Sequence, residues 1–398
     1  MLIRCTPAGS WKRLAPVVLA NRLPFSRRLP AEWRAALLLF VCTRFCLTIV
    51  GVLARLMMPG AHAGGVPAHY THCSAIDIWG AWDTECYMEI ARSGYHFDVH
   101  AAVGSDAQTS VAFFPLYPLI ARLLGLLFGS IFLSGLLISS ICAIGASVLL
   151  YRLARLDHDE ATAMRSVRYL YAFPMAFVLS AFLTEALFLC LSLGCLYSAR
   201  KQRWFLSGSL GLLAALTRPV GVLLVLPMLV ECAVAHGFRR CRVHPDILWM
   251  LLVPLGTCLF GLYCWHLTTD FLAFSHVQTA WGRHLADPVY VLCAGLLSPN
   301  LNERFSSWFT TVFLLWMIHG VRSIRWSYWL LGMALILAPL ATGSTMSMPR
   351  FLVPAFPLYL VCARTTKSAG FHEAALIALA FLQGCLMGFR TNAFAISM

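Results

Sequence analysis

The chain has 398 residues, of which 60% are hydrophobic and only 12% are charged, and its mean hydropathy is +0.75. A soluble domain usually carries about 25% charged residues, so this composition excludes an ordinary cytosolic protein, a disordered chain and a small disulfide scaffold. The net charge of +13 does not indicate nucleic-acid binding, because the basic residues lie in short loops between apolar runs. The sequence predicts an all-α integral membrane protein.

The apolar runs predict about 11 transmembrane helices. The clearest spans are 35–58, 132–153, 247–267, 304–319, 326–343 and 372–390. Three further stretches are of the wrong length for one full span, or are interrupted by polar residues, and they predict short helices. These are 169–199, interrupted at Thr184-Glu185; 204–235, interrupted at Thr217-Arg218-Pro219; and 351–363, after Met348-Pro349-Arg350. The run 112–128 contains two prolines and Arg122 and predicts an interfacial or re-entrant helix.

Basic residues orient the chain. With the N-terminus inside, inner segments hold 21 of the 30 Lys and Arg residues and outer segments hold 7, as the positive-inside rule requires. Residues 1–34 form a basic cytoplasmic segment, and residues 35–398 form one polytopic membrane domain whose first outer loop is 59–131. We expect a bacterial plasma membrane, or the membrane of the endoplasmic reticulum if the protein is eukaryotic.

The first outer loop contains a predicted amphipathic helix that starts at Asp83 and ends at Gly94, as capping preferences favour. Asp83 has two interpretations: an N-cap residue, or a general base at the membrane surface. One well-placed carboxylate suffices for a base. Glu85 and Glu89 fit either a solvated helix face or a polar site, and Trp82 and Tyr87 are aromatic side chains able to stack on a sugar ring.

Three charged residues fall at interrupted helix ends on the outer side: Glu185, Arg218 and Arg350. Interrupted helices at membrane depth usually line a cavity enclosed by protein. The two arginines could instead extend toward the interface from a helix end. An acid inside a long apolar stretch is costly unless it is paired or functional, so Glu185 is the hardest of the three to explain as a structural residue.

Six fragments of the chain occur in an order typical of a known family. They are Trp82-Asp83-Thr84-Glu85 with Tyr95, Ala112-Phe113-Phe114-Pro115-Leu116-Tyr117-Pro118-Leu119, Thr184-Glu185-Ala186-Leu187-Phe188, Thr217-Arg218-Pro219-Val220-Gly221, Gln278-Thr279-Ala280-Trp281-Gly282, and Pro349-Arg350-Phe351 with Pro354 and Pro357. Over roughly residues 35–365 the chain resembles the PIG-V-like family, the second mannosyltransferase of GPI-anchor synthesis. That family belongs to the GT-C superfamily of polytopic membrane glycosyltransferases. The basic N-terminal extension departs from the family pattern.

The resemblance implies transfer of a sugar, with mannose preferred, from a polyprenyl-phosphate donor to an acceptor hydroxyl on the non-cytoplasmic face, with inversion. Asp83 would be the base and Glu85 its partner. Arginine suits a phosphate because its planar fork binds two oxygens, so Arg218, Arg350 and Arg283 are the candidate donor-phosphate ligands. Candidate sugar or acceptor ligands are Trp82, Tyr87, Glu185, Gln278 and Trp281, although Gln278 and Trp281 equally fit loop packing on the membrane surface.

We expect no cofactor and no metal ion, since the histidines near Cys73 lack zinc-site spacing. The expected partners are the lipid-linked sugar donor, a lipid or glycolipid acceptor and the membrane itself. Two other functions stay open. A transporter or lipid flippase also uses broken helices and buried charges, and a non-catalytic subunit of a glycosylation complex would share the architecture.

Overall fold

The computed structural model describes residues 29–58, 69–97, 110–237, 245–366 and 368–394, and within these ranges it contains helices and no strand. The α-helices and the 3-10 helices, labelled η, are α1 Ala31–Met57, α2 Ser74–Asp77, α3 Thr84–Ser93, η1 Ser110–Ala112, α5 Leu116–Phe128, α6 Ile131–Ala154, α7 Glu160–Ala172, η2 Ala176–Ser180, α8 Glu185–Arg200, α9 Trp204–Ala215, η3 Pro219–Leu224, α10 Val225–His236, η5 Pro245–Leu251, α11 Leu252–Thr268, α12 Ala273–His276, η6 Val277–Trp281, α13 Pro288–Leu296, α14 Leu301–His319, α15 Trp326–Leu340, α16 Met348–Phe351, α17 Pro357–Thr365 and α18 Ala369–Thr391. The all-α membrane fold predicted from composition is confirmed.

Five helical stretches are long and apolar enough to cross a membrane. They are Ala31–Met57, Ile131–Ala154, Pro219–His236, Pro245–Thr268 and Ala369–Thr391, and shorter apolar helices cover Leu116–Phe128, Trp204–Ala215 and Trp326–Leu340. The chain is therefore a multi-pass membrane protein. The predicted number of 11 spans, the orientation of the N-terminus and the single-domain division stay predictions, and residues 1–28 of the basic N-terminal segment lie outside the described residues.

The predicted helix interruptions at Thr184-Glu185 and at Thr217-Arg218-Pro219 are confirmed. The third prediction is wrong in detail, because Met348-Pro349-Arg350 is itself helical and the short helix predicted for 351–363 begins at Pro357. Helix α8 starts at Glu185, α9 ends just before Thr217-Arg218-Pro219, and α16 contains Met348-Pro349-Arg350. Proline explains the break at Arg218-Pro219, because its ring cannot continue a helix and forces the preceding residue out of the α conformation. Arg218 accordingly has extended backbone, with φ −153° and ψ 145°.

The segment 173–184, whose only helix is the short 3-10 helix η2, connects α7 to α8, and every residue in it is buried. Its backbone cannot reach water, so other elements must satisfy its carbonyl groups. Gln383 of α18 donates to the Phe173 carbonyl at 3.0 Å, and Arg44 of α1 donates to the Ala176 carbonyl at 2.8 Å. These bonds attach the segment that precedes α8 to α1 and α18.

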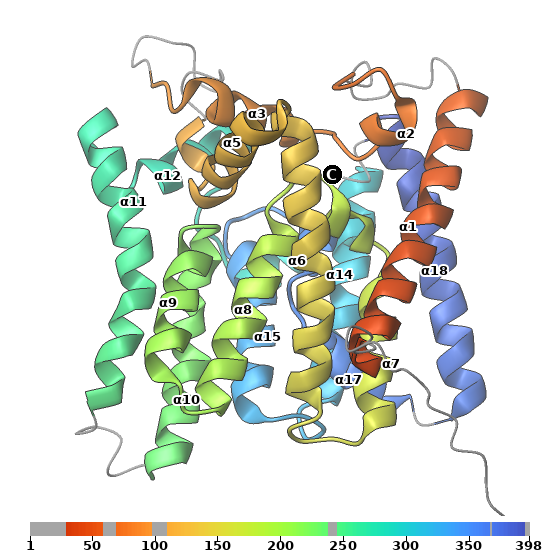
Figure 1. Cartoon of the computed structure of the whole chain (residues 1–398), viewed down its shortest axis with the longest axis vertical. Helices are drawn as coiled ribbons and strands as arrows, with labels where there is room; N and C mark the ends of the chain where they lie inside the picture. The colour runs from red at the N-terminus through yellow and green to blue at the C-terminus, as the bar shows by residue number, and fades with distance from the viewer. Residues whose placement is uncertain (1–28, 59–68, 98–109, 238–244, 367, 395–398) are drawn as a thin grey trace, which may run out of the picture.

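The long helices run roughly along one direction, with α11 at one edge of the bundle and α1 beside α18 at the other (Figure 1). The short helices α2, α3, α5 and α12 gather at one end. Packing of α6 on α8, α8 on α9 and α9 on α11 places the start of α8 and the end of α9 side by side beneath these short helices. Residues distant in sequence therefore meet at one end of the bundle.

Candidate active site

Asp83 is held at the start of α3 by its neighbours. Trp82 has a left-handed backbone with φ 58°, which is unusual for a bulky side chain. Thr84 is fully buried and donates a hydrogen bond to the Phe182 carbonyl at 3.3 Å, which attaches the loop to the buried segment before α8. Asp83 occupies the N-cap position, but its side chain makes no capping hydrogen bond.

The Asp83 carboxylate instead contacts an arginine. Arg350 Nη2 donates to Asp83 Oδ2 at 2.7 Å, while 29% of the Asp83 side chain stays exposed. Arg350 is buried, and its Nε lies 3.3 Å from Glu185 Oε1. Burial disfavours the charge on Arg350, but the carboxylates of Asp83 and Glu185 outweigh burial and raise its pKa. The guanidinium therefore stays charged and keeps Asp83 oriented.

Glu185 connects two arginines. Its Oε1 lies 2.8 Å from Arg218 Nη1 and 3.3 Å from Arg350 Nε, and the side chain is only 1% exposed. Its Oε2 has no hydrogen-bond partner among the described residues. Because Glu185 is buried behind the arginines, its contacts are those of a residue that positions Arg218 and Arg350.

Arg283 is the third arginine, in the loop after η6. It donates to the Thr342 hydroxyl at 2.9 Å and to the Met346 carbonyl at 3.3 Å, both neutral oxygens. Burial and repulsion from Arg350 lower the pKa of Arg283 to about 10. Arg283 thus carries a positive charge at neutral pH, and no carboxylate of the described residues forms a hydrogen bond with it.

The three arginines all form cation–π contacts with the ring of Phe351. The guanidinium carbons of Arg218, Arg283 and Arg350 lie 5.2, 5.4 and 5.3 Å from the centre of the Phe351 ring. A ring face attracts cations, more strongly where water is excluded. Among these three arginines and the carboxylates of Asp83 and Glu185, a formal surplus of one positive charge is left. The buried Arg390, which does not line the cavity, also interacts electrostatically with Arg350, Glu185 and Asp83.

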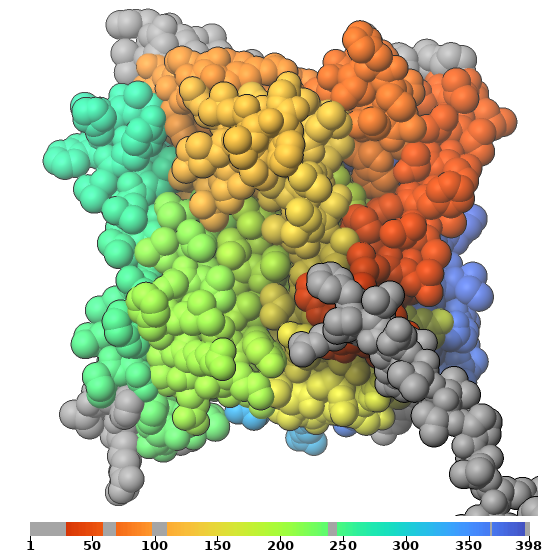
Figure 2. All heavy atoms as spheres, in the orientation of Figure 1, coloured from red at the N-terminus to blue at the C-terminus, as the bar shows by residue number. Residues whose placement is uncertain are grey.

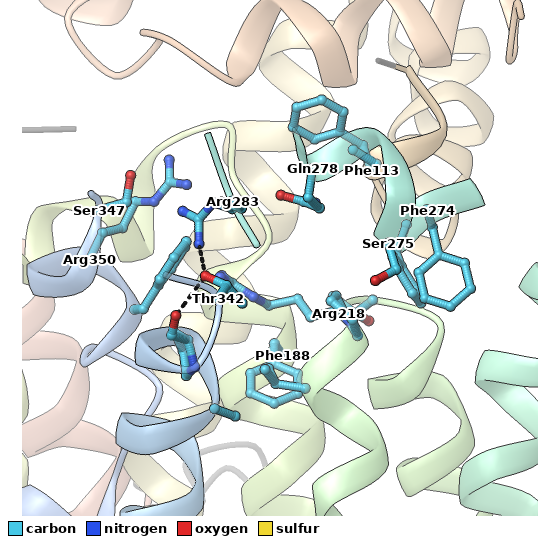
Figure 3. A pocket seen from close by; sticks show the side chains of 18 of the residues that line it. Phe113, Phe188, Arg218, Phe274, Ser275, Gln278, Arg283, Thr342, Ser347 and Arg350 are labelled. Atoms are coloured by element: carbon cyan, nitrogen blue, oxygen red, sulfur yellow. Dashed lines mark hydrogen bonds between the residues drawn. The ribbon is translucent and has the colours of Figure 1, made fainter. Parts of the chain in front are cut away.

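The three arginines line a cavity of about 400 Å³, which is within the usual size range of small-ligand sites. Figure 3 shows Arg283 and Arg350 on one side of it, Arg218 across from them, and Gln278, Ser275 and Phe113 around the rest. Other lining residues are Asp83, Tyr87, Phe114, Phe188, Thr217, Pro219, Trp281, Thr342, Met346, Ser347, Phe351 and Pro354. The cavity combines one carboxylate, three guanidinium groups and aromatic walls.

Most residues singled out in the sequence meet here. Tyr87, Gln278 and Trp281 line the cavity with Asp83 and the three arginines. Tyr87 and Trp281 both pack edge-on against Phe113, at ring-centre distances of 5.0 and 6.1 Å. Burial, and secondarily the charge of Asp83, raise the pKa of Tyr87, so its hydroxyl stays protonated and can donate a hydrogen bond.

Three predicted residues are not among the cavity-lining residues: Glu185, which is buried behind the arginines, Glu85 and Trp82. Glu85 is exposed, and its carboxylate adds to the effect of burial in raising the pKa of Tyr70. Trp82 is half-buried, and its indole nitrogen is buried without a hydrogen-bond partner among the described residues. Helical spacing explains the position of Glu85, because Asp83 and Tyr87 lie four residues apart on one face at the start of α3 and Glu85 lies on another. Trp82 precedes α3 and has a left-handed backbone, so helical spacing does not place its side chain.

The sequence interpretation missed three contributors. Phe351 organises the guanidinium groups, and Thr342 and the Met346 carbonyl position Arg283. Phe351 directly follows Arg350 in a quoted fragment, so an arginine-aromatic pair at a helix break was a usable signal. No comparable signal marked Thr342.

Within the described ranges, no three His, Cys, Asp or Glu residues gather in a way that could hold a metal ion. The expectation of no metal and no cofactor was not tested and stays a prediction. The polar groups that line the described site include those of the arginines, the carboxylate of Asp83, the Tyr87 hydroxyl, the Gln278 amide and the hydroxyls of Thr217, Ser275, Thr342 and Ser347.

Comparison with known proteins identifies a family model that matches part of the chain and a solved structure with a similar fold. A family model described as dolichyl-phosphate-mannose-protein mannosyltransferase matches residues 112–265, less than half of the chain. A crystal structure of ArnT from Cupriavidus metallidurans bound to undecaprenyl phosphate is similar, with TM-score 0.51 and 14% identity over 91% of this chain and 76% of ArnT. No curated protein sequence matches the chain significantly.

An oligosaccharyltransferase from Archaeoglobus fulgidus gives a lower score. Its apo form has TM-score 0.43 and 12% identity, over 89% of this chain and 56% of the archaeal chain. The similarity to ArnT extends over nearly the whole chain, although the sequences have diverged almost completely. The chain therefore shares the overall fold of ArnT.

Proposed function

We propose that the protein is a GT-C-type glycosyltransferase that moves a sugar from a polyprenyl-phosphate donor to an acceptor hydroxyl. The observation that carries the proposal is the surplus positive charge of Arg218, Arg283 and Arg350 beside the Asp83 carboxylate in one cavity. A base and a phosphate site must be adjacent for this reaction. The likeness of fold to ArnT, whose crystal structure holds undecaprenyl phosphate, supports the same class of donor.

The reaction consists of one proton transfer and one nucleophilic substitution at the anomeric carbon of the donor sugar. The acceptor O–H gives its proton to Asp83, and the acceptor oxygen attacks the anomeric carbon of the donor sugar. The bond from that carbon to the phosphate oxygen breaks, and the phosphate leaves with the electron pair. Attack from the side opposite the phosphate inverts the anomeric centre. The aromatic wall formed by Tyr87, Phe113 and Trp281 suits a sugar ring.

The net charge of the site matches the charge of the phosphate before and after the sugar is transferred. The donor phosphodiester carries one negative charge, which matches the resting surplus of one positive charge. When Asp83 takes the proton, the carboxylate becomes neutral and the surplus rises to two. The leaving phosphate gains its second negative charge in the same step. Groups whose attraction grows as charge develops lower the barrier, because they bind the transition state more tightly than the ground state.

The identity of the sugar, the class of acceptor and the membrane face of the cavity are proposed from the resemblance of the sequence to the PIG-V-like family. We propose mannose as the sugar, a lipid or glycolipid as the acceptor and the non-cytoplasmic face as the location of the cavity. The Trp82-Asp83-Thr84-Glu85 segment and its five companion fragments support the PIG-V-like assignment. The description of the family model that matches residues 112–265 also contains a polyprenyl-phosphate mannose donor. Glu85, outside the cavity lining, is proposed only as a residue that contacts the acceptor from the loop.

A reconstitution experiment tests the function. Purified protein in lipid vesicles is incubated with polyprenyl-phosphate mannose, radiolabelled in the sugar, and a membrane lipid extract, and the products are separated by chromatography. We expect the label to move to a new lipid-soluble product, and we expect no transfer by the Asp83→Ala variant. Labelled donor that crosses the bilayer unchanged would instead indicate a flippase. A folded protein that transfers nothing with any acceptor fraction would favour the non-catalytic subunit.

A further inference from the structure

A second cavity, of about 530 Å³, lies between α6, α8 and α9. These helices pack side by side on the face of the bundle shown in Figures 1 and 2. The residues that line it are Leu149 of α6, Cys190, Leu191, Gly194, Tyr197 and Ser198 of α8, Leu206 and Leu210 of α9, and Lys201 and Arg203 of the turn between them. We name this set the α8–α9 groove. None of its residues lines the candidate active site.

The groove has the dimensions of one lipid leaflet. Its lining extends along α8 from Cys190 to Lys201, about 16 Å at 1.5 Å per residue, which is roughly half of a ~30 Å hydrocarbon core. Gly194 forms the floor, because a β-carbon there would lie 3.2 Å from a Leu210 methyl and 3.8 Å from a Leu149 methyl. A larger residue at Gly194 would fill the space between these two leucines.

The end of the α8–α9 groove at the turn between α8 and α9 is positively charged. Lys201 and Arg203 are both exposed, and neither forms an ion pair within the described residues. The Lys201 ammonium lies 5.8 Å from the centre of the Tyr197 ring, which holds it at the rim. The neighbouring Arg200 differs, since its guanidinium donates to both oxygens of Asp157 at 2.6 and 2.8 Å. Two adjacent cations thus stay available where an apolar groove ends.

We propose that the α8–α9 groove binds an anionic glycerophospholipid of the membrane. One acyl chain would lie over Gly194, and the phosphate would contact Lys201 and Arg203. An apolar slot alone accepts any lipid, whereas two unpaired cations at its mouth favour a negative headgroup. Helix α8 begins at Glu185 and the groove reaches its other end, about 24 Å away, so the lipid would bind at the membrane face opposite the candidate active site. The proposal is independent of the glycosyl-transfer function.

Native mass spectrometry of the full-length protein, released from vesicles, measures the lipid directly. The probes are dioleoylphosphatidylglycerol and dioleoylphosphatidylcholine, which share acyl chains and differ in headgroup charge. Each basic residue near an anionic headgroup contributes about five-fold to binding, so two predict about a thirty-fold preference for phosphatidylglycerol (~2 kcal/mol). We expect Lys201→Gln with Arg203→Gln to remove this preference without changing the melting temperature measured in detergent alone.

A matched control changes two exposed basic residues that do not line the groove, Arg155→Gln with Arg322→Gln. We expect this double variant to keep the preference. Gly194→Leu tests the apolar part, and we expect it to lower the retention of both lipids. Equal retention of the two lipids by the unmodified protein would overturn the proposal, as would equal losses in the test and control pairs. Displacement by undecaprenyl phosphate but not by phosphatidylglycerol would assign the groove to the carrier lipid instead.

Discussion

Two charged clusters lie at opposite ends of α8, and they differ in how their charges balance. At the end far from the cavity, Arg200 donates to both oxygens of Asp157, and Arg325 donates to both oxygens of Glu231 at 3.0 Å. Two cations therefore meet two anions, and Ser327 also donates to Glu231. This cluster is complete without a ligand and joins the helix ends that it connects.

The cluster at the cavity has three arginines for two carboxylates, and Arg283 contacts only neutral oxygens. An uncompensated buried charge is costly, so a protein that keeps one at a cavity wall needs it for a ligand. The contrast is one of charge balance: the arginines at the cavity outnumber their carboxylates and leave a positive charge for a ligand, whereas paired arginines such as Arg200 join helix ends. Missing carboxylates alone do not indicate function, because the buried Arg44 contacts only neutral oxygens and attaches α1 to the segment before α8. Each prediction below changes one side of this comparison.

Among the arginines, the largest effect is expected at Arg218, which faces the cavity across from Arg283 and Arg350. Arg218→Gln removes a group that binds the leaving phosphate more tightly as its charge grows. Loss of one such donor costs about 10²–10³-fold in rate, so we expect kcat/KM for the donor to fall by about that factor in the vesicle assay. Arg218→Lys keeps the charge but not the fork and should recover only part of the activity. Full activity of the glutamine variant would exclude Arg218 from phosphate binding.

A change at the balanced cluster should affect stability instead. Glu231→Gln neutralises the partner of Arg325 and weakens the environment of Arg200, whose Nε lies 3.6 Å from Glu231. Breaking a buried ion pair from one side costs about 3 kcal/mol. We expect a lower denaturation midpoint in detergent, with turnover per folded molecule unchanged. A selective loss of turnover without loss of stability would show that this cluster also serves catalysis.

Arg283 should have a smaller effect on the donor alone. Its hydrogen bonds to Thr342 and Met346 hold the guanidinium in place without neutralising it, so Arg283→Gln removes one charge and leaves the Asp83–Arg350 pair intact. We expect the KM for the donor to rise about ten-fold, as is typical for a single charge-assisted hydrogen bond, and kcat to change less. Thr342→Val, which removes one support of Arg283, is expected to shift KM in the same direction by a smaller factor.

The smallest effect concerns pH. Because the pKa of Arg283 is lowered to about 10, its guanidinium is charged below that pH and loses its charge above it. Donor affinity should therefore be constant well below pH 10 and weaken as pH rises through that value, by at most the effect of Arg283→Gln. The glutamine variant should show no such decline. An identical alkaline decline in both proteins would assign the titration to another group.

The sequence predicted the fold class and two of the three helix breaks because these depend on local properties. Apolar run length predicts spans, and proline after Arg218 requires a break wherever the rest of the chain lies. From the sequence we expected only that Asp83 and Arg350 lie on the same face of the membrane, and not that they are in contact. Their 2.7 Å contact joins residues 267 positions apart, and no local pattern encodes such a distance.

The positions of Glu85 and Glu185 show the same limit. Spacing on α3 separated Glu85 from Asp83, but which face would meet the cavity depends on packing against the segment before α8. The cost of burying Glu185 predicted that it would be paired or functional, and its contacts with Arg218 and Arg350 explain that cost. That Glu185 would lie behind the arginines, and not in the cavity lining, follows from tertiary contacts alone.

The central claim is that Asp83 takes the proton of the acceptor while the arginines hold the phosphate. The most direct measurement compares Asp83→Asn with Glu89→Gln, a change at an exposed carboxylate of the same helix, in donor binding and in sugar transfer. We predict that Asp83→Asn binds the donor but transfers sugar about 10²–10⁴-fold more slowly, whereas Glu89→Gln retains both. Near-normal transfer by a folded Asp83→Asn protein would contradict the account.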